Sequence, residues 1–214
     1  MRSSKKFFTT HNLVYLAILT ALLIVLQIWG SGIKIMGTVS LNLSLIPIVL
    51  GSLILGVYGG AFLGFVCGLI TLIAGISGID VFTNYLFGQH PVFTAFICLF
   101  KTTMAGVLSA VVYKAFANKK RYLGTFLASA TAPIVNTALF IILALMMSGT
   151  LESSGFIADG QSVVYFLVIV CAGVNFLVEL AVNLLVAPAI YRVYGVLDRT
   201  LLSKYRSEDL GEEV

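Results

Sequence analysis

The sequence from Ile35 to Ile79 reads IMGTVSLNLSLIPIVLGSLILGVYGGAFLGFVCGLITLIAGISGI and contains no charged residue. About 20 apolar residues cross a bilayer as a helix, so this stretch is too long for one crossing and suits two. Three of the five residues of Gly56–Gly60 are glycine, a pattern typical of a turn. The stretch therefore predicts two membrane helices joined near Gly56.

The rest of the chain has the same apolar character. Of its 214 residues 59% are hydrophobic and 10% are charged, and the mean hydropathy is +1.05. A soluble domain averages about 25% charged residues. A fold in water needs a polar exterior, whereas a fold in lipid does not. We therefore expect an all-α integral membrane protein, and the net charge of +4 is too small to indicate nucleic-acid binding.

Charged residues separate the expected helices, which together form a six-helix membrane bundle. The expected helices are 13–33, two within 35–79, about 92–113, 122–151 and 162–194, and the polar stretch 81–91 reads as a loop. The membrane domain is expected over 13–196. Residues 1–12 and 197–214 are expected to form a cytoplasmic N-terminus and a cytoplasmic, frayed tail.

Three basic clusters predict the orientation, because cytoplasmic ends and short loops collect Lys and Arg. They lie at Arg2–Lys6, Lys114–Arg121 and Arg192–Arg206. All three share a side only if an even number of helices separates each from the next. Four and two crossings satisfy this condition, and a single helix over 35–79 does not. Both termini are therefore expected in the cytoplasm.

Small residues recur at helical spacing in two places. Gly56, Gly60, Gly64 and Gly68 follow one another every four positions, which places them on one face where another backbone can approach closely. The favoured interpretation is a packing seam inside the bundle. Ala17 and Ala21 form a shorter AxxxA pattern on the first helix, and this pattern is weak by itself.

Polar residues inside the apolar runs are candidates for function, because ionisable groups in a membrane are costly. Lys101 lies about nine residues into its helix, and Asn136 follows Pro133. Asn175, Glu179 and Asn183 are spaced four apart and share one helix face. One interpretation is a cavity open to the outside in which Lys101 meets an anionic ligand. The alternative is a structural Lys101–Glu179 ion pair, and the sequence leaves both open.

The stretch 75–91 combines aromatic residues with Asn84, Gln89 and His90. It either covers a binding site or serves as an ordinary surface loop. The three cysteines lie in apolar runs without a metal-ligand spacing, so packing roles are expected, with no metal and no cofactor.

One pattern raises the possibility of a membrane enzyme. Gly75–Gly78 spells GxSG, the nucleophile motif of intramembrane rhomboid proteases, but such a serine needs a base beside it. His11 and His90 both lie outside the expected membrane helices. We therefore expect no catalytic residues and no enzyme activity. A membrane enzyme and a scaffold protein are the competing hypotheses.

Four stretches together resemble the substrate-binding S components of energy-coupling-factor (ECF) vitamin transporters. They are LAILTA at Leu16–Ala21, LIPIVLG at Leu45–Gly51 followed by Gly56, GAFLG at Gly60–Gly64, and VNFLVE at Val174–Glu179. The last is similar to the pantothenate branch. The likeness covers the six-helix body, about 13–194. The stretch 78–91 and the region after Pro133 do not match the S components of any single vitamin.

The resemblance implies a multi-pass protein of the cell membrane that captures a vitamin outside the cell. It then docks on a coupling (T) subunit driven by two cytoplasmic ATPase subunits. Ala17 and Ala21 would form the docking face. The implied ligand-binding residues are Asn84, Gln89, His90, Lys101, Asn136, Asn175 and Glu179. Pantothenate fits a lysine that faces a carboxylate, and folate or riboflavin remains open.

Overall fold

The computed structural model of the chain describes residues 10–31, 34–35, 39–40, 42–117, 120–158 and 160–211. Its elements are α1 (Thr10–Ser31), β1 (Lys34–Ile35), β2 (Val39–Ser40), α2 (Leu45–Ile76), α3 (Val81–Gln89), α4 (Pro91–Ala117), α5 (Arg121–Leu145), α6 (Ser148–Glu152), α7 (Val163–Tyr165), the π-helix η1 (Phe166–Gly173) and α8 (Val174–Gly211). The two short strands pair antiparallel, with Lys34 opposite Ser40. The expected termini 1–12 and 197–214 fall partly outside the described residues.

Five helical segments of the described chain are long and apolar enough to cross a membrane. They are Thr10–Gly30, Leu45–Ile76, Pro91–Ala117, Arg121–Leu145 and Val163–Leu197. On α1, Leu19 and Leu23 are buried, whereas Ile18 and Val25 are about 60% exposed on the outside. An apolar exterior as well as an apolar core is typical of a membrane bundle. The expectation of a helical, multi-pass membrane protein is therefore confirmed.

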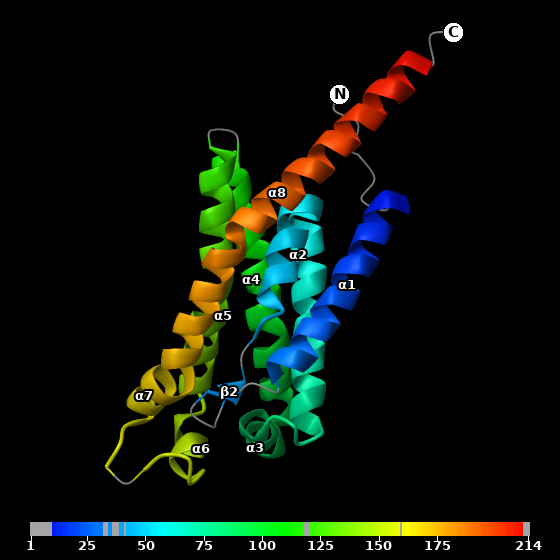
Figure 1. The fold of residues 1–214 in the computed structure, drawn as a ribbon. Helices are drawn as coiled ribbons and strands as arrows, with labels where there is room; N and C mark the ends of the chain where they lie inside the picture. The colour runs from blue at the N-terminus through cyan, green and yellow to red at the C-terminus, as the bar shows by residue number, and fades with distance from the viewer. Residues whose placement is uncertain are drawn as a thin grey trace.

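The helix α2 reverses direction at Gly56. Gly56 has φ 69° and ψ −156°, a backbone conformation that glycine adopts without strain. The segments before and after Gly56 lie side by side: Ser44 Oγ, before the turn, is 2.9 Å from Cys67 Sγ, after it. The cyan first arm and the teal second arm run in opposite directions in Figure 1. The turn predicted near Gly56 is thus confirmed.

The two arms of α2 differ in length. The first, from Leu45 to Gly56, covers about 16 Å at 1.5 Å per residue, roughly half of the apolar core of a bilayer. The second, from Gly56 to Ile76, covers about 30 Å. The first arm begins inside the bundle, where Asn42 and Ser44 are buried.

Glycines of the second arm pack against the backbone of α4. A Cβ on Gly68 would lie 2.6 Å from the carbonyl oxygen of Cys98, and a Cβ on Gly64 or Gly60 would overlap the carbonyl groups of Thr102 or Gly106. The predicted seam is therefore an internal contact between α2 and α4, as expected for small residues at such a spacing. Gly56 belongs to the turn instead of the seam.

Three elements differ from the sequence-based expectation. The stretch 81–91, expected as a loop, contains α3, because the Asp80 side chain accepts a hydrogen bond from Thr83 N and caps the helix. The fifth expected helix ends at Leu145 and a separate short α6 follows. The sixth includes the π-helical turns of η1 and continues to Gly211, through the stretch expected as a frayed tail.

The helices enclose a space at one end of the bundle. Each of the pairs α1–α2, α2–α4, α4–α5 and α5–α8 packs together, and α2 also contacts α8. In Figure 1, α3, α6 and α7 lie at one end. The bend between the two arms of α2, the end of α4 and the far part of α8 lie toward the other. The first end contains an apolar cluster that includes Phe82, Leu86, Leu151 and Phe166.

Candidate ligand-binding site

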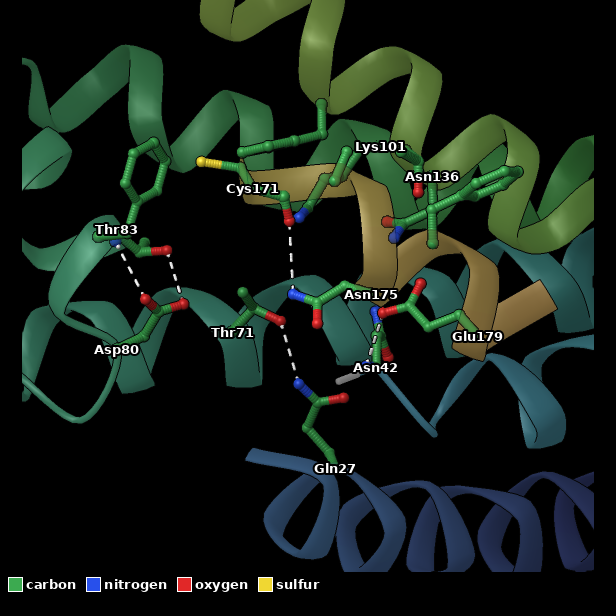
Figure 2. A pocket seen from close by; sticks show the side chains of 15 residues that line it. Gln27, Asn42, Thr71, Asp80, Thr83, Lys101, Asn136, Cys171, Asn175 and Glu179 are labelled. Atoms are coloured by element: carbon green, nitrogen blue, oxygen red, sulfur yellow. Dashed lines mark hydrogen bonds between the residues drawn. The ribbon is translucent and has the colours of Figure 1, made fainter. Parts of the chain in front are cut away.

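A cavity of about 80 Å³ lies among the helices at the end of the bundle that carries α3. A buried water needs roughly 10–15 Å³ by the same measure, so the space holds several small groups. All five long helical segments contribute to its wall, as Figure 2 shows. The lining residues are Gln27, Asn42, Thr71, Asp80, Phe82, Thr83, Lys101, Asn136, Thr137, Phe140, Cys171, Ala172, Asn175, Phe176 and Glu179.

Lys101 is the only cation among the lining residues that the structure describes. It is half-buried on α4, and its Nζ lies 5.0 Å from the centre of the Phe140 ring on α5. A cation over an aromatic face gains a modest electrostatic stabilisation. No carboxylate of the described chain forms an ion pair with it. The Lys101–Glu179 ion pair, one of the two alternatives that the sequence left open, is thus not formed here, although both side chains line one cavity.

Glu179 is 5% exposed on α8. Its Oε1 accepts a hydrogen bond of 2.8 Å from the backbone N–H of Asn42, and no other hydrogen bond reaches the side chain from the described residues. Asn183, one turn further, donates through Nδ2 to the backbone oxygen of Glu179 at 2.8 Å. The polar stripe predicted from the spacing therefore points into the bundle.

Two asparagines complete the predicted polar set. Asn136 is 6% exposed on α5, and no described residue hydrogen-bonds its side chain. Asn175 is 5% exposed, and its Nδ2 donates to the backbone oxygen of Cys171 at 3.4 Å. That oxygen belongs to η1, and π-helical turns occur frequently at functional sites. The structure thus brings Lys101, Asn136, Asn175 and Glu179 together.

A network of buried side chains holds Asn42 in place in the cavity wall. Ser44 Oγ donates to Gln27 Oε1 at 2.6 Å and is also hydrogen-bonded to Asn42 Oδ1. Gln27 Nε2 donates to Thr71 Oγ1 at 3.4 Å. Sequence reasoning missed Gln27 and Asn42. The available signal was that Gln27 is the only amide side chain in the first apolar run, 13–33.

Asp80 lines the cavity but is already bonded within its own helix. Its carboxylate accepts from Thr83 N at 3.2 Å and from Thr83 Oγ1 at 2.9 Å. These bonds stabilise the beginning of α3. Asp80 therefore contributes negative charge to the wall without pairing with Lys101.

The remaining predicted ligand residues lie away from this cavity. Asn84 is exposed, and its Nδ2 donates to the backbone oxygen of Gly75 at 2.8 Å. Gln89 is exposed. His90 is exposed, and its Nε2 lies 2.9 Å from Thr150 Oγ1. A ligand-binding role for these three residues stays a prediction.

The predicted docking residues are on the outside of the bundle. Ala17 and Ala21 are exposed on α1. They line a shallow apolar groove together with Leu13, Leu16, Thr20, Ile24 and Phe62. Phe62 of α2 borders this groove, and both alanines stay exposed in the described chain; their role in docking stays a prediction.

The serine of the GxSG pattern lies outside the cavity. Ser77 is exposed just beyond α2, and its Oγ donates to the backbone oxygen of Ala74 at 3.1 Å. His90, the candidate base on the same side, is bonded to Thr150. Across the described chain no three His, Cys, Asp or Glu side chains group as metal ligands.

Comparison with protein families supports the transporter hypothesis. The family model of the substrate-specific component of ECF transporters matches residues 11–191. The chain belongs to this family. As an S component it is a multi-pass membrane protein and a substrate-specific subunit of a transporter, in a family of transporter subunits and not enzymes. No curated protein matches the sequence significantly.

Proposed function

We propose that this S component captures a vitamin outside the cell and delivers it through an ATP-driven partner complex, with pantothenate as the first candidate. The observation that carries the proposal is the cavity of polar side chains around Lys101. Because Lys101 has no anionic partner in the described chain, a ligand carboxylate fits there with a charge-assisted hydrogen bond. The likeness of Val174–Glu179 to the pantothenate branch supports the same choice, with folate and riboflavin as alternatives.

Mass spectrometry of the gently purified, denatured protein tests this function. We expect a vitamin, pantothenate first, to be released in near-stoichiometric amount, and the two ATPases to be recovered with the protein from its native membrane. A membrane enzyme or a scaffold would yield neither. Release of folate or riboflavin would keep the transporter function and correct the substrate.

The proposed topology has six crossings with both termini in the cytoplasm. The reversal at Gly56 supports it, because α2 then crosses twice with one short arm. The irregular backbone at 42–44, where Asn42 and Ser44 are buried, lies within the protein, and a membrane tolerates irregular backbone in such a place. With this topology the cavity opens toward the outside and the Gly56 turn faces the cytoplasm.

Cysteine labelling in intact cells measures this topology. A cysteine at Ser154 should react with an impermeant thiol reagent, whereas cysteines at Tyr58, at Asn118, which lies outside the described residues, and at Ser4 or Ser207 should not. The native cysteines in the described chain are buried, which keeps the background low. Labelling at Tyr58 or Asn118 from outside would contradict the six crossings.

Docking on the coupling (T) subunit is proposed at the groove around Ala17 and Ala21. The groove is lined by the small side chains of α1 and by larger apolar ones, including Phe62. Small residues allow the helix of a partner to approach closely within lipid. Two cytoplasmic ATPases would drive the coupling subunit.

Replacing both Ala17 and Ala21 with Trp should fill the groove. We expect copurification with the coupling subunit to fall below a tenth of wild type and uptake to stop, while the isolated protein keeps its ligand affinity. The control is Ile18→Trp, which introduces one Trp at an exposed position turned about 100° around α1 from Ala17. Loss of ligand binding in the double variant would show that the groove serves the binding site instead.

A further inference from the structure

After the hydrogen bonds among the described lining residues are assigned, acceptor oxygens of Glu179 and Asn136 remain open, in addition to the donor group of Lys101. Gln27 and Asn42 are hydrogen-bonded in the Ser44 network, and Asp80 caps α3. Glu179 has one hydrogen bond, from Asn42 N to Oε1. The side chain of Asn136 receives none from the described residues. The cavity therefore combines one cation with acceptors that are incompletely hydrogen-bonded by the described chain.

We propose that Glu179 and Asn136 bind hydrogen-bond donors of the ligand, hydroxyl or N–H groups, at the end opposite its acid group. The substrate class is thus an organic acid that carries donors on its far end. This inference concerns the same cavity and rests on the proposed function. It assigns to Glu179 the selection of the donor-bearing end, whereas Lys101 takes the acid.

The first reason is the cost of a buried carboxylate. Glu179 is 5% exposed and is removed from bulk water. A buried polar group that lacks hydrogen-bond partners is destabilising, and a charged group is more so. The single N–H of Asn42 leaves the second oxygen to be satisfied. A hydroxyl or N–H group of the ligand donates a hydrogen bond to this oxygen. An apolar ligand end displaces water from the oxygen and offers no hydrogen bond in its place.

The second reason is position. Lys101 extends from α4 and is held over the Phe140 ring, and Glu179 extends from α8 and is held by Asn42. Figure 2 shows both side chains and Asn136 directed into the same space from different helices. Since the two charges do not pair, a molecule between them contacts both. Such a site rejects a ligand without the donor far more strongly than an apolar pocket does.

The experiment compares two acids on the full chain in lipid nanodiscs. Pantothenate has hydroxyl groups on its acyl end, and N-pivaloyl-β-alanine has the same β-alanine acid and amide but a tert-butyl group instead. Calorimetry measures both affinities for wild type, Glu179→Gln and the control Glu152→Gln, whose carboxylate is exposed on α6. We expect the wild-type preference for pantothenate to fall at least tenfold in Glu179→Gln and to stay unchanged in Glu152→Gln. An unchanged preference in Glu179→Gln overturns the inference.

The unfolding temperature without ligand distinguishes a failure of the Glu179 inference from a failure of the proposed function. Without added compound, Glu179→Gln should unfold at the wild-type temperature or above, because it removes an incompletely bonded carboxylate. A lower temperature that Lys101→Met restores in the double variant would show a structural pair and overturn the inference. If neither acid binds wild type, pantothenate is wrong as substrate. In that case the compound released from the purified protein tests the inference. Hydrogen-bond donors outside the acid group of that compound support the inference, and a compound without such donors overturns it.

Discussion

We expect the replacement of Lys101 with Met to lower the affinity for pantothenate, the proposed substrate, at least tenfold and to leave the protein folded. Lys101 is the only cation among the described lining residues, so no other side chain there offsets its loss. Tenfold in affinity corresponds to about 1.4 kcal/mol. A charge-assisted hydrogen bond in a partly desolvated site is worth about this amount or more. Met keeps the unbranched apolar stem, so its contact with Phe140 is largely retained.

The control for this change is Lys114→Met, on the same helix and exposed. It removes the same charge outside the cavity, and its affinity should match wild type. Isothermal titration and the unfolding temperature, measured on both variants in the same lipid, separate binding from stability. A folded Lys101→Met protein that binds pantothenate as wild type would rule out contact between this lysine and the ligand.

Replacing Gly64 with Leu disrupts the contact between α2 and α4. The new Cβ would overlap the Thr102 carbonyl group, which is helix backbone and moves only with the whole of α4. Overpacking of a rigid contact costs about 1–3 kcal/mol and sometimes more, and here the two helices must separate. We expect a loss of about 3 kcal/mol or more, seen as a fall of the unfolding temperature by roughly 6–12 °C or as failure to accumulate.

The matched control is Gly88→Leu on α3. A Cβ there meets no atom within 4 Å, so the same side chain is added in open space. Its unfolding temperature should stay within about 2 °C of wild type. Equal thermal stability of Gly64→Leu and wild type would contradict the close approach of the two backbones.

Several features of this S component follow from the sequence because each depends on local spacing. Long uncharged runs mark the membrane segments, since a bilayer demands about 20 apolar residues whatever surrounds them. The turn at Gly56 follows from a glycine cluster, and the Gly60–Gly68 seam follows from spacing by four. The same periodicity turns Asn175 and Glu179 to one face, and both are buried.

The elements α3 and η1, beside the cavity, were harder to predict from the sequence. For α3, two local signals competed. Gly, Pro and polar residues in 75–91 indicated a loop, whereas Asp80 followed by Thr83 at capping distance favoured a helix, and the cap prevailed. In the last segment the apolar run is continuous, so nothing in its hydropathy distinguishes the π-helical turns of η1 from an ordinary helix. Those turns shape the wall at Cys171 and Ala172.

The sequence by itself thus determined a helical membrane bundle, the position of its turn, its glycine seam and the inward direction of its polar stripe. Only the tertiary structure decided that Gln27 and Asn42 join the cavity, that His90 does not, and that Lys101 faces Phe140 instead of pairing with Glu179. The reason is physical. Periodicity determines which residues share a face of one helix, but which faces meet depends on how the helices tilt and pack against one another.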